Sequence, residues 1–242
     1  MALSFAADFS ARYGYCDRFG AMGLSNLLKE CQQISMEHSD ALGIGYHGYL
    51  RPKKLGFLLA KQRVTAREMP LGGEQLTLTT SASRAGAFYL RENRLLGLKG
   101  GEKTELARVE ARWVLVDLAA VRILRRPPPE IAELFPNEAE AFGDFRVKRP
   151  ENPQKTLLLR ALPSLCDVNG HINNASYADL LLDALDEQIG PGRKLRELEI
   201  VYSRQILHGA EFELLCQGQD DEFLFLGQDG AGALFQARAR LG

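Results

Sequence analysis

Residues 167–174 of the chain, Asp-Val-Asn-Gly-His-Ile-Asn-Asn, place five polar side chains within eight positions. His171 is the side chain of this cluster whose reference pKa lies near neutrality. It can therefore take a proton from water and later hand one to a leaving group. These residue types predict a site of acid–base chemistry centred on His171.

An ordinary structural role would explain part of the same run. An Asn-Gly pair tolerates the positive φ of a tight turn, and Asn173 or Asn174 is well placed to cap a following helix. Neither role accounts for His171. The first half of the chain builds a corresponding junction from residues 17–22, Asp-Arg-Phe-Gly-Ala-Met, without any histidine or asparagine. Two junctions of which only one is polar predict one working site.

An internal repeat supplies the elements that position this cluster. The pairs Cys16-Asp17 and Cys166-Asp167 lie 150 positions apart, and each ends a strand-like stretch, at residues 13–17 and 157–167. A helical pattern follows each pair and is predicted to end near a glycine, Gly43 in the first half and, after Ile189, Gly190 in the second. The apolar residues at helical spacing are Leu24, Leu27, Leu28, Cys31 and Ile34, then Tyr177, Leu180, Leu181, Ala184 and Leu185.

Strand-like segments follow the helical pattern in both halves. They are residues 58–67, 74–82, 86–96 and 104–117, then residues 195–205, 211–217, 222–226 and 233–240. Polar and apolar residues alternate within residues 75–79 and 211–214, which predicts sheets with one face covered. Each half is therefore predicted to be a long helix wrapped by an antiparallel sheet.

The segment between the halves is rich in proline and mixed charge, which is typical of a linker, with one short helix around residues 130–134. The predicted class is α+β, with two tandem units. We expect a first domain over residues 1–120, a linker over residues 121–155 and a second domain over residues 156–242, the second carrying the polar cluster.

Composition excludes several classes of protein. The chain has 242 residues, 45% hydrophobic and 25% charged, with a net charge of −1, which gives no reason to expect nucleic acid as a partner. No stretch of about 18 uninterrupted apolar residues exists, so no membrane span is predicted. The first residues lack the basic segment of a signal peptide, and the four cysteines show neither C-x-x-C nor zinc spacing. A cytoplasmic protein with reduced cysteines is the expectation.

Residues 167–177, DVNGHINNASY, resemble the signature of the acyl-acyl carrier protein (acyl-ACP) thioesterases of plants and bacteria. That signature is Asp-x-Asn-x-His-x-Asn-Asn, followed by a helix with an early tyrosine. The resemblance covers nearly the whole chain, with further ordered matches at residues 27–43, 57–74, 107–117, 125–131 and 195–206. It implies two tandem hot-dog units and hydrolysis of fatty acyl thioesters.

The resemblance also implies catalytic roles for Asp167, Asn169 and His171. A thioester carbonyl needs a donor for the oxygen that becomes negative and an activated water to attack it. Asp167 can orient or polarise His171, and Asn169 or a backbone N–H at the helix start can hold the oxygen. Whether Asp167 or His171 is the direct base stays open.

Two positions depart from the family pattern. The family's glutamate on the following strand falls on Gln205, and the cysteine of the plant enzymes falls on Ile206. Ile206 cannot be a nucleophile. Gln205 can bind a water or a carbonyl, and it belongs to the predicted catalytic set, but it cannot accept a proton as a carboxylate would. Asp167 and His171 are therefore the residues expected to carry the acid–base chemistry.

The first repeat is predicted to supply most of the acyl-chain pocket. Met22 and Leu24 would face the hydrocarbon tail, with plain core packing as the alternative, and Asn173 and Asn174 complete the predicted substrate-binding set. The other histidines, His38, His47 and His208, are expected at the surface. Cys166 is expected to be a buried strand residue, and Cys31 and Cys216 are expected to be core residues. No metal site and no cofactor is expected.

Three functions fit these observations. The first is an acyl-ACP thioesterase, acting on an acyl carrier protein that carries a fatty acyl chain. The second is an acyl-coenzyme A thioesterase, and the third is a catalytically silent acyl-binding protein, which Gln205 favours. Basic residues at 51–54, 122–126 and 146–149 would either dock an acidic carrier or be ordinary solvated charge. A homodimer is possible, because a duplicated chain is either complete alone or pairs further.

Overall fold

The computed structural model describes residues 3–136, 145–185, 188–190 and 192–242. Two compact units divide the chain, and neither is continuous in sequence. Unit 1 comprises Met1–Gly23, Leu27–Ala60 and Arg67–Asp144, and unit 2 comprises Leu24–Asn26, Lys61–Ala66 and Phe145–Gly242. The second strand of the chain, β2, therefore contributes its first half to unit 1 and its second half to unit 2.

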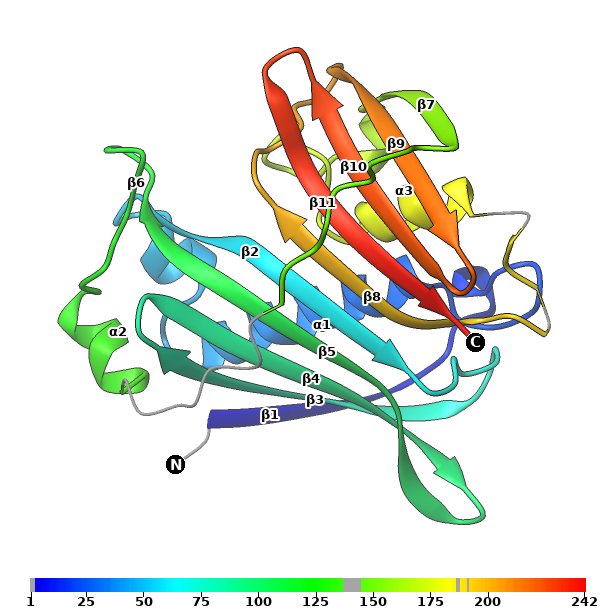
Figure 1. Ribbon diagram of the computed structural model, residues 1–242. Helices are drawn as coiled ribbons and strands as arrows, with labels where there is room; N and C mark the ends of the chain where they lie inside the picture. Colours follow the sequence, from blue (N-terminus) through cyan, green and yellow to red (C-terminus); the bar gives the residue numbers. More distant parts are fainter. Residues whose placement is uncertain (1–2, 137–144, 186–187, 191) are drawn as a thin grey trace. The chain divides into compact units, whose positions relative to one another are not determined.

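Unit 1 is a sheet with one long helix against it (Figure 1). Its strands run in the hydrogen-bonded order β1-β3-β4-β5-β2, and helix α1 packs on the sheet through contacts that include His38 with Phe5 of β1. The elements are β1 (Leu3–Ser10), α1 (Leu24–Ala41), a π-helical turn (Tyr46–Leu50), β2 (Leu55–Ala66), β3 (Gln75–Ala85), β4 (Phe88–Lys99), β5 (Glu102–Asp117), β6 (Arg122–Ile123) and α2 (Pro129–Leu134).

Unit 2 is an antiparallel sheet in the order β8-β11-β10-β9-β7. Helix α3 packs on it through Tyr177, whose ring meets those of Tyr202 and Phe235 edge to face. The second half of β2 adds to this sheet, because Lys61–Thr65 pair antiparallel with β8. The elements are β7 (Lys155–Arg160), α3 (Ser176–Ala184), β8 (Leu195–Tyr202), β9 (Glu211–Gln219), β10 (Glu222–Asp229) and β11 (Gly232–Leu241).

Alternation of residue type decides which face of each sheet is covered. In β3, Leu76 and Leu78 are buried while Thr77 between them is partly exposed. In β9, Phe212 and Leu214 are buried while Glu213 between them is exposed. Side chains at every second position of a strand lie on one face. The predicted alternation, and all eight strands of the two predicted sets, are therefore confirmed, as is the short helix α2 within the proline-rich segment.

The strand predicted at residues 13–17 is wrong, and the one predicted at residues 157–167 is only partly right. Tyr13–Tyr15 and Pro163–Leu165 form 3-10 turns, each preceded by a strand that ends earlier, β1 at Ser10 and β7 at Arg160. Pro163 starts the second turn, where its fixed φ suits a helical turn and its missing N–H costs nothing. Each turn leads the chain off the sheet edge and into the loop before the helix.

The two helices end differently from each other. After α1 the chain turns at Gly43, which has a φ of +74° and accommodates the left-handed stop that was predicted there. The prediction that the second helix runs to Ile189 is wrong, because α3 ends at Ala184 with a non-helical cap at Leu185. The three residues that follow Leu185 in the sequence are polar, Asp-Glu-Gln, so the apolar face is interrupted there.

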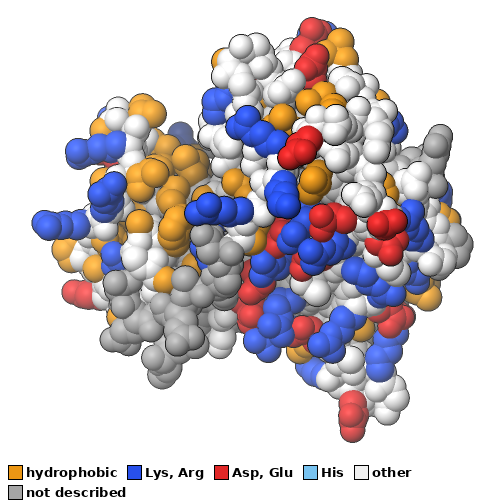
Figure 2. All heavy atoms as spheres, viewed as in Figure 1, with side chains coloured by type: hydrophobic (Ala, Val, Ile, Leu, Met, Phe, Trp, Pro, Cys, Tyr) orange, Lys and Arg blue, Asp and Glu red, His pale blue; other side chains and the backbone are white. Residues whose placement is uncertain are grey.

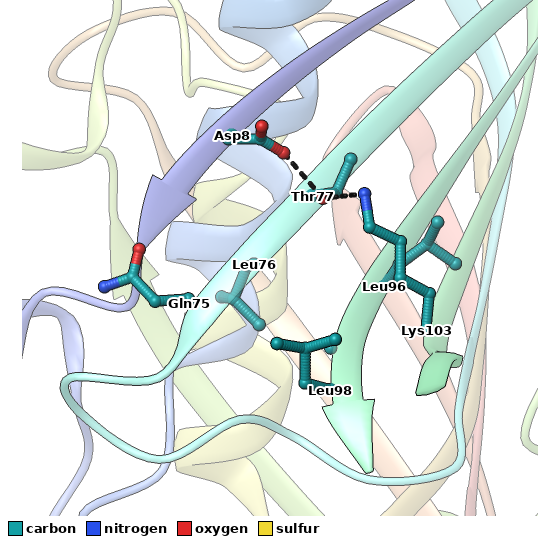
Figure 3. A pocket seen from close by; sticks show the side chains of 8 residues that line it. Asp8, Gln75, Leu76, Thr77, Leu96, Leu98 and Lys103 are labelled. Atoms are coloured by element: carbon teal, nitrogen blue, oxygen red, sulfur yellow. Dashed lines mark hydrogen bonds between the residues drawn. The ribbon is translucent and has the colours of Figure 1, made fainter. Parts of the chain in front are cut away.

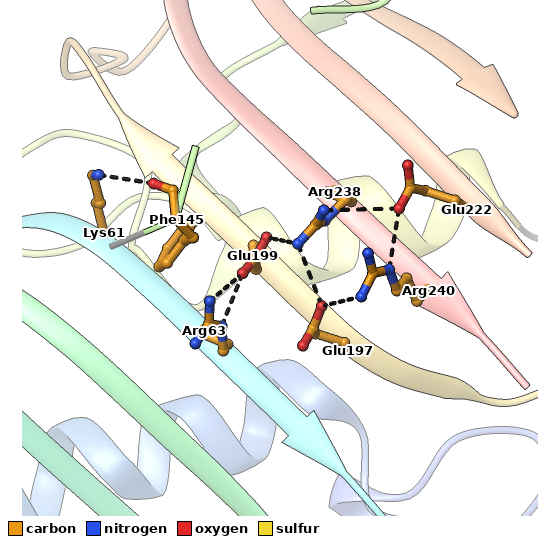
Figure 4. A network of polar contacts seen from close by, with 8 residues as sticks. All are labelled: Lys61, Arg63, Phe145, Glu197, Glu199, Glu222, Arg238 and Arg240. Carbon is orange, nitrogen blue, oxygen red and sulfur yellow. Dashed lines mark hydrogen bonds and ion pairs between the residues drawn. The ribbon is translucent and has the colours of Figure 1, made fainter. Parts of the chain in front are cut away.

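A buried network of ion pairs ties three strands of unit 2 together (Figure 4). Glu199 of β8 is fully buried, and its Oε1 accepts hydrogen bonds from Nε of Arg63 on β2 at 2.8 Å and lies 2.7 Å from Nη2 of the same guanidinium. Its Oε2 accepts a hydrogen bond from Nη2 of Arg238 on β11. A single carboxylate thus holds two guanidiniums from the neighbouring strands on either side.

Further carboxylates extend this network toward solvent. Glu197 lies 3.6 Å from Arg238 and 3.3 Å from Arg240, and Glu222 accepts a hydrogen bond from Nε of Arg240 at 3.1 Å. Beside Arg63, the ammonium of Lys61 donates to the carbonyl of Phe145 at 2.9 Å, and the Arg63 guanidinium stacks over the Phe145 ring. The three arginines and three glutamates of the network balance in charge, so the fully buried carboxylate of Glu199 is compensated by its neighbours.

The prediction that His38 lies at the surface is wrong. Its ring is buried on α1, stacks against Phe5, and its Nδ1 lies 3.2 Å from Nη1 of Arg91, which also donates to Thr80. Burial, and secondly the positive charge of Arg91, lower the pKa of His38 below its ordinary value of 6.5. Burial also lowers the pKa of Arg91, to about 10. The neutral imidazole therefore serves as an acceptor for the guanidinium.

A pH dependence of stability follows from His38. The pKa of His38 is lower in the folded chain than in the unfolded chain. Below pH 6.5, His38 is therefore protonated in the unfolded chain while it stays neutral in the folded one. The free energy of unfolding should therefore fall as the pH drops from 6.5 toward the folded-state pKa, and the substitution His38→Asn, which keeps an acceptor but cannot titrate, should flatten this slope. Urea unfolding at several pH values measures it. His47→Asn, at an exposed histidine, is the matched control, and an unchanged slope in His38→Asn would show that other groups govern it.

Candidate active site

The polar cluster lies on a tight loop between β7 and α3. The N–H of Asp167 donates to the carbonyl of His171 at 2.9 Å, and the N–H of Gly170 donates to the carbonyl of Asp167 at 3.0 Å. The Asp167 carboxylate accepts a further bond from the N–H of Asn169 at 2.8 Å. Gly170 has a φ of +77°, a conformation that favours glycine. The aspartate thus builds the loop that carries the histidine.

The first half contains a loop with the same hydrogen bonds but without histidine or asparagine. The N–H of Asp17 donates to the carbonyl of Ala21 at 2.8 Å, Gly20 donates to Asp17 at 3.0 Å with a φ of +80°, and the Asp17 carboxylate accepts from the N–H of Phe19 at 2.8 Å. These bonds repeat those of the second loop 150 positions earlier. The loop-building role of the aspartate is therefore common to both loops, and the difference lies at Phe19 against Asn169 and Ala21 against His171.

Three predicted catalytic side chains come together in the second loop. Nδ1 of His171 lies 3.6 Å from Oδ1 of Asp167, and both side chains are 21% exposed. Nδ2 of Asn169 donates to Oδ2 of Asp167 at 3.3 Å. The histidine–aspartate separation lies within the range of an ion pair and is longer than a hydrogen bond. Partial burial leaves the imidazole reachable from solvent.

The loop rests on the segment that follows β8. Ile172 donates its N–H to the carbonyl of Ile206 at 2.9 Å, and the N–H of His208 donates to the carbonyl of Gly170 at 2.9 Å. Gln205 precedes Ile206 directly, and its side chain is exposed. The sequence prediction grouped Gln205 with the loop, and the backbone pairing places the segment that contains it beside the loop.

Asn173 and Asn174 fix the start of α3. Oδ1 of Asn173 accepts the N–H of Ala175 at 2.8 Å, and the carbonyl of Asn173 accepts the N–H of Ser176 at 2.8 Å. No side chain caps the first turn of α3 at the cap residue Ala175. Asn173 instead closes a local turn just before the helix by accepting the Ala175 N–H. The carbonyl of Asn174 accepts a hydrogen bond from the hydroxyl of Tyr202 at 3.4 Å.

Two polar residues near the loop were not predicted from the sequence. The Tyr202 hydroxyl also lies 3.3 Å from Oε1 of Gln62, a buried side chain on β2. Burial, with a smaller effect of Tyr177, raises the pKa of Tyr202, so its hydroxyl stays protonated and can donate. The sequence contains little indication of this contact, because a glutamine within a strand, such as Gln62, is expected to face solvent unless its partner is known.

Met22 and Leu24, predicted to face an acyl chain, are buried residues at the start of the first helix. The Met22 N–H donates to the carbonyl of Pro70 at 2.8 Å. Their contact with a substrate stays a prediction. Among the other candidates, Cys31 and Cys216 are buried, and burial raises the pKa of both thiols. The prediction that Cys166 is a buried strand residue is wrong, because it is partly exposed and follows the 3-10 turn after β7.

A hollow of about 220 Å³ on the sheet of unit 1 contains none of the predicted site residues (Figure 3). Its polar groups satisfy one another, since Thr77 donates to Asp8 at 2.6 Å and accepts from Lys103 at 3.0 Å. Its volume is below that of a typical ligand pocket. In the described part of the chain, no group of three or more His, Cys, Asp or Glu side chains has an arrangement that could hold a metal ion.

A helix packed on an antiparallel sheet, with a polar loop leading into the helix, is the hot-dog type of fold. Residues 2–135 match the family described as "Acyl-ACP thioesterase N-terminal domain" and residues 159–232 match "Acyl-ACP thioesterase C-terminal domain". The chain belongs to the acyl-ACP thioesterase family.

Relatives of this family resemble the chain over almost its full length. A chloroplastic acyl-[acyl-carrier-protein] hydrolase of Cuphea viscosissima is 23% identical over 99% of this chain, which spans 60% of that relative's length. The solved acyl-ACP thioesterase of Bacteroides thetaiotaomicron has a TM-score of 0.84 at 18% identity, covering 99% of this chain and 98% of that one. The solved 12:0-ACP thioesterase of Umbellularia californica has a TM-score of 0.83 at 17% identity, and the match covers 99% of this chain and 97% of that one. Both structures confirm the fold.

None of the described helices is both long and apolar enough to cross a membrane.

Proposed function

We propose that this chain is a thioesterase that hydrolyses fatty acyl-ACP to free fatty acid and holo-ACP. The observation that carries the proposal is the contrast between two loops with the same backbone hydrogen bonds, of which only one bears Asn169 and His171. Family membership and the names of the relatives supply the substrate class.

The geometry suits a mechanism in which water is the nucleophile. With its Nδ1 proton directed at Asp167, His171 keeps Nε2 free to take a proton from water as that water attacks the thioester carbonyl. The carbonyl oxygen becomes negative, and the amide of Asn169, or an N–H at the start of α3, donates to it. The carbon–sulfur bond then breaks, and the protonated histidine returns its proton to the carrier thiolate.

Gln205 and Ile206 limit the alternatives. Ile206 is buried and apolar, so no covalent acyl intermediate can form at this position. Gln205 is exposed beside the loop and can hold the attacking water by a hydrogen bond, while the proton goes to His171. This assignment gives Gln205 a positioning role.

The test is a screen of free-acid release by the purified chain against acyl-ACP and acyl-coenzyme A substrates of several chain lengths. We expect turnover with a higher kcat/KM on acyl-ACP. A higher kcat/KM on acyl-coenzyme A would show that coenzyme A, and not the acyl carrier protein, is the preferred carrier. Acyl binding without release of free acid on either carrier would mean a silent acyl-binding protein, the function that Gln205 in place of glutamate favours.

Catalysis should not need a thiol. Burial raises the pKa of Cys216, which disfavours its thiolate, and Cys166 corresponds to Cys16 of the loop that lacks chemistry. The double substitution of Cys166 and Cys216 by alanine should therefore leave kcat within about threefold of the wild type, well inside the loss of 100-fold or more expected on removing a catalytic group. An acyl-cysteine trapped by mass spectrometry would contradict this mechanism.

The first repeat should set the preferred chain length. If Met22 and Leu24 border the acyl pocket, truncating either to alanine gives room for longer chains and should change relative kcat/KM between adjacent lengths by a factor of about 10, the scale of one methylene contact. Leu181→Ala, at a buried position on α3, is the matched control for loss of packing. If Leu181→Ala changed the chain-length preference while Met22→Ala and Leu24→Ala did not, the acyl pocket would have to be assigned to the second repeat.

Three further assignments belong to the same proposal: two tandem hot-dog domains over residues 1–120 and 156–242, a homodimer, and a cytoplasmic location. The repetition of the loop hydrogen bonds at a spacing of 150 residues supports the tandem organisation. Sedimentation equilibrium tests the dimer, and cell fractionation tests the location.

A further inference from the structure

The turn between β5 and β6 in unit 1 carries unusually exposed aliphatic side chains. Leu118, Val121 and Ile123 are 51%, 89% and 55% exposed. Figure 1 shows this turn at one end of the unit's sheet, and Figure 2 shows hydrophobic side chains with Lys and Arg side chains around them over this end. Scattered single apolar residues are normal on a surface, but several together mark a contact site.

The turn is held in a fixed conformation. The Asp117 carboxylate accepts the N–H groups of Ala119 and Ala120 at 3.0 and 2.9 Å, and Val116 pairs with Ile123 across the hairpin. The N–H of Leu118 donates to the carbonyl of Lys54 at 2.8 Å, which fixes the segment after the π-helical turn beside it. The apolar side chains are thus presented by an ordered scaffold.

Val121 occupies a conformation that its residue type disfavours. Its φ is 51°, in the left-handed region where glycine and asparagine are common and β-branched residues are rare outliers. A residue that suits the backbone would be polar or lack a side chain, whereas the chain places an aliphatic group there, almost fully exposed. Strain of this kind is found where function requires the side chain.

Cations surround these aliphatic groups. Residues 46–54 and 117–130 contain six Lys and Arg side chains and two carboxylates, a local charge of +4 in a chain of net charge −1. The two carboxylates are engaged, Glu130 with Lys53 at 2.9 Å and Asp117 with Arg122 at 4.0 Å. Among the described residues, no carboxylate pairs with the exposed cations Arg51, Lys54, Arg125 or Arg126.

We propose that this surface, the β5–β6 patch, binds an anionic lipid bilayer, with Leu118, Val121 and Ile123 entering the headgroup region and the four cations contacting lipid phosphates. Aliphatic groups on a projecting turn suit a soft apolar layer, which needs no shaped pocket to receive them. Basic side chains supply the second, electrostatic part of such binding. The proposal is independent of the thioesterase assignment.

The test is flotation of the full chain with vesicles of phosphatidylcholine alone or of phosphatidylcholine mixed equally with phosphatidylglycerol. We expect binding to the anionic vesicles only, falling at high salt because screening weakens the electrostatic part. Val121→Asn, which relieves the backbone and removes the aliphatic group, combined with Ile123→Asn, should reduce the bound fraction about tenfold, and so should Arg125→Gln with Arg126→Gln.

Leu158→Asn, at an exposed leucine on β7, is the matched control and should bind as the wild type does. Failure of the wild type to bind anionic vesicles would overturn the proposal, and so would patch variants that bind as well as Leu158→Asn. Protection of the β5–β6 patch from hydrogen exchange by holo-ACP but not by anionic vesicles would assign it instead to an acidic protein. Turnover of soluble substrate by the patch variants, measured in parallel, reports separately on the proposed function.

Discussion

Replacing His171 by alanine should lower kcat for thioester hydrolysis by about 100- to 10,000-fold, the usual cost of losing a general acid–base group. The side chain is 21% exposed and the loop is closed by backbone bonds and by Asp167, so the free energy of unfolding should change by only about 1 kcal/mol or less. Single-turnover measurement of free-acid release, with urea unfolding of the same preparation, separates the two effects.

His208→Ala is the matched control for this experiment. His208 donates its backbone N–H to Gly170 of the same loop, yet its side chain is exposed, so its loss should leave kcat unchanged. Asp167→Asn keeps an acceptor for the N–H of Asn169 but removes the charge beside the imidazole, and its pH–rate profile distinguishes an orienting aspartate from a direct base. Near-normal turnover in His171→Ala would remove the histidine from the mechanism.

Replacing Glu199 by alanine should destabilise the protein by about 3–5 kcal/mol, the cost of leaving a buried charge without its partner. Two guanidiniums, those of Arg63 and Arg238, would lose the fully buried carboxylate that holds them. Since typical domains are stable by about 5–15 kcal/mol, this single change should remove a large fraction of the total. The shift of the urea midpoint, at constant slope, measures it.

Glu222→Ala is the control for Glu199. It removes a carboxylate of the same network whose side chain is 43% exposed, and a surface ion pair contributes about 1 kcal/mol or less. A double-mutant cycle of Glu199→Ala with Arg63→Ala isolates this pair, because the second substitution removes one of the two stranded guanidiniums and should recover part of the loss, while Arg238 stays in place. Equal, small effects at Glu199 and Glu222 would show that the buried carboxylate is dispensable.

Local features of the sequence predicted the loop and the strands well. The Asp-x-Asn-Gly-His run defines its own turn, since Asp167 bonds to Asn169 and Gly170 supplies the positive φ, so short-range chemistry suffices. The alternation of β3 and β9 predicted their buried faces for a similar reason, since it reflects one sheet with one covered side.

Features that depend on partners distant in sequence were not predictable. His38 is buried because Phe5 and Arg91 meet it from two different strands. Glu199 reads as a solvent-facing residue of an alternating strand until Arg63 and Arg238 are known to flank it. The same holds for Tyr202 and Gln62, whose hydroxyl and amide come together although the two residues are 140 positions apart.

The division of β2 between the two units bears on any attempt to dissect the chain. A fragment beginning at residue 156 would lack Lys61–Thr65, the segment that pairs with β8, and with it the guanidinium of Arg63. Its β8 would be an open edge with unpaired backbone groups. Glu199 would keep the guanidinium of Arg238 but lose that of Arg63. Open edges of this kind recruit strands from other molecules. The isolated fragment should therefore self-associate or aggregate, and adding back a peptide of residues 55–66 should suppress this.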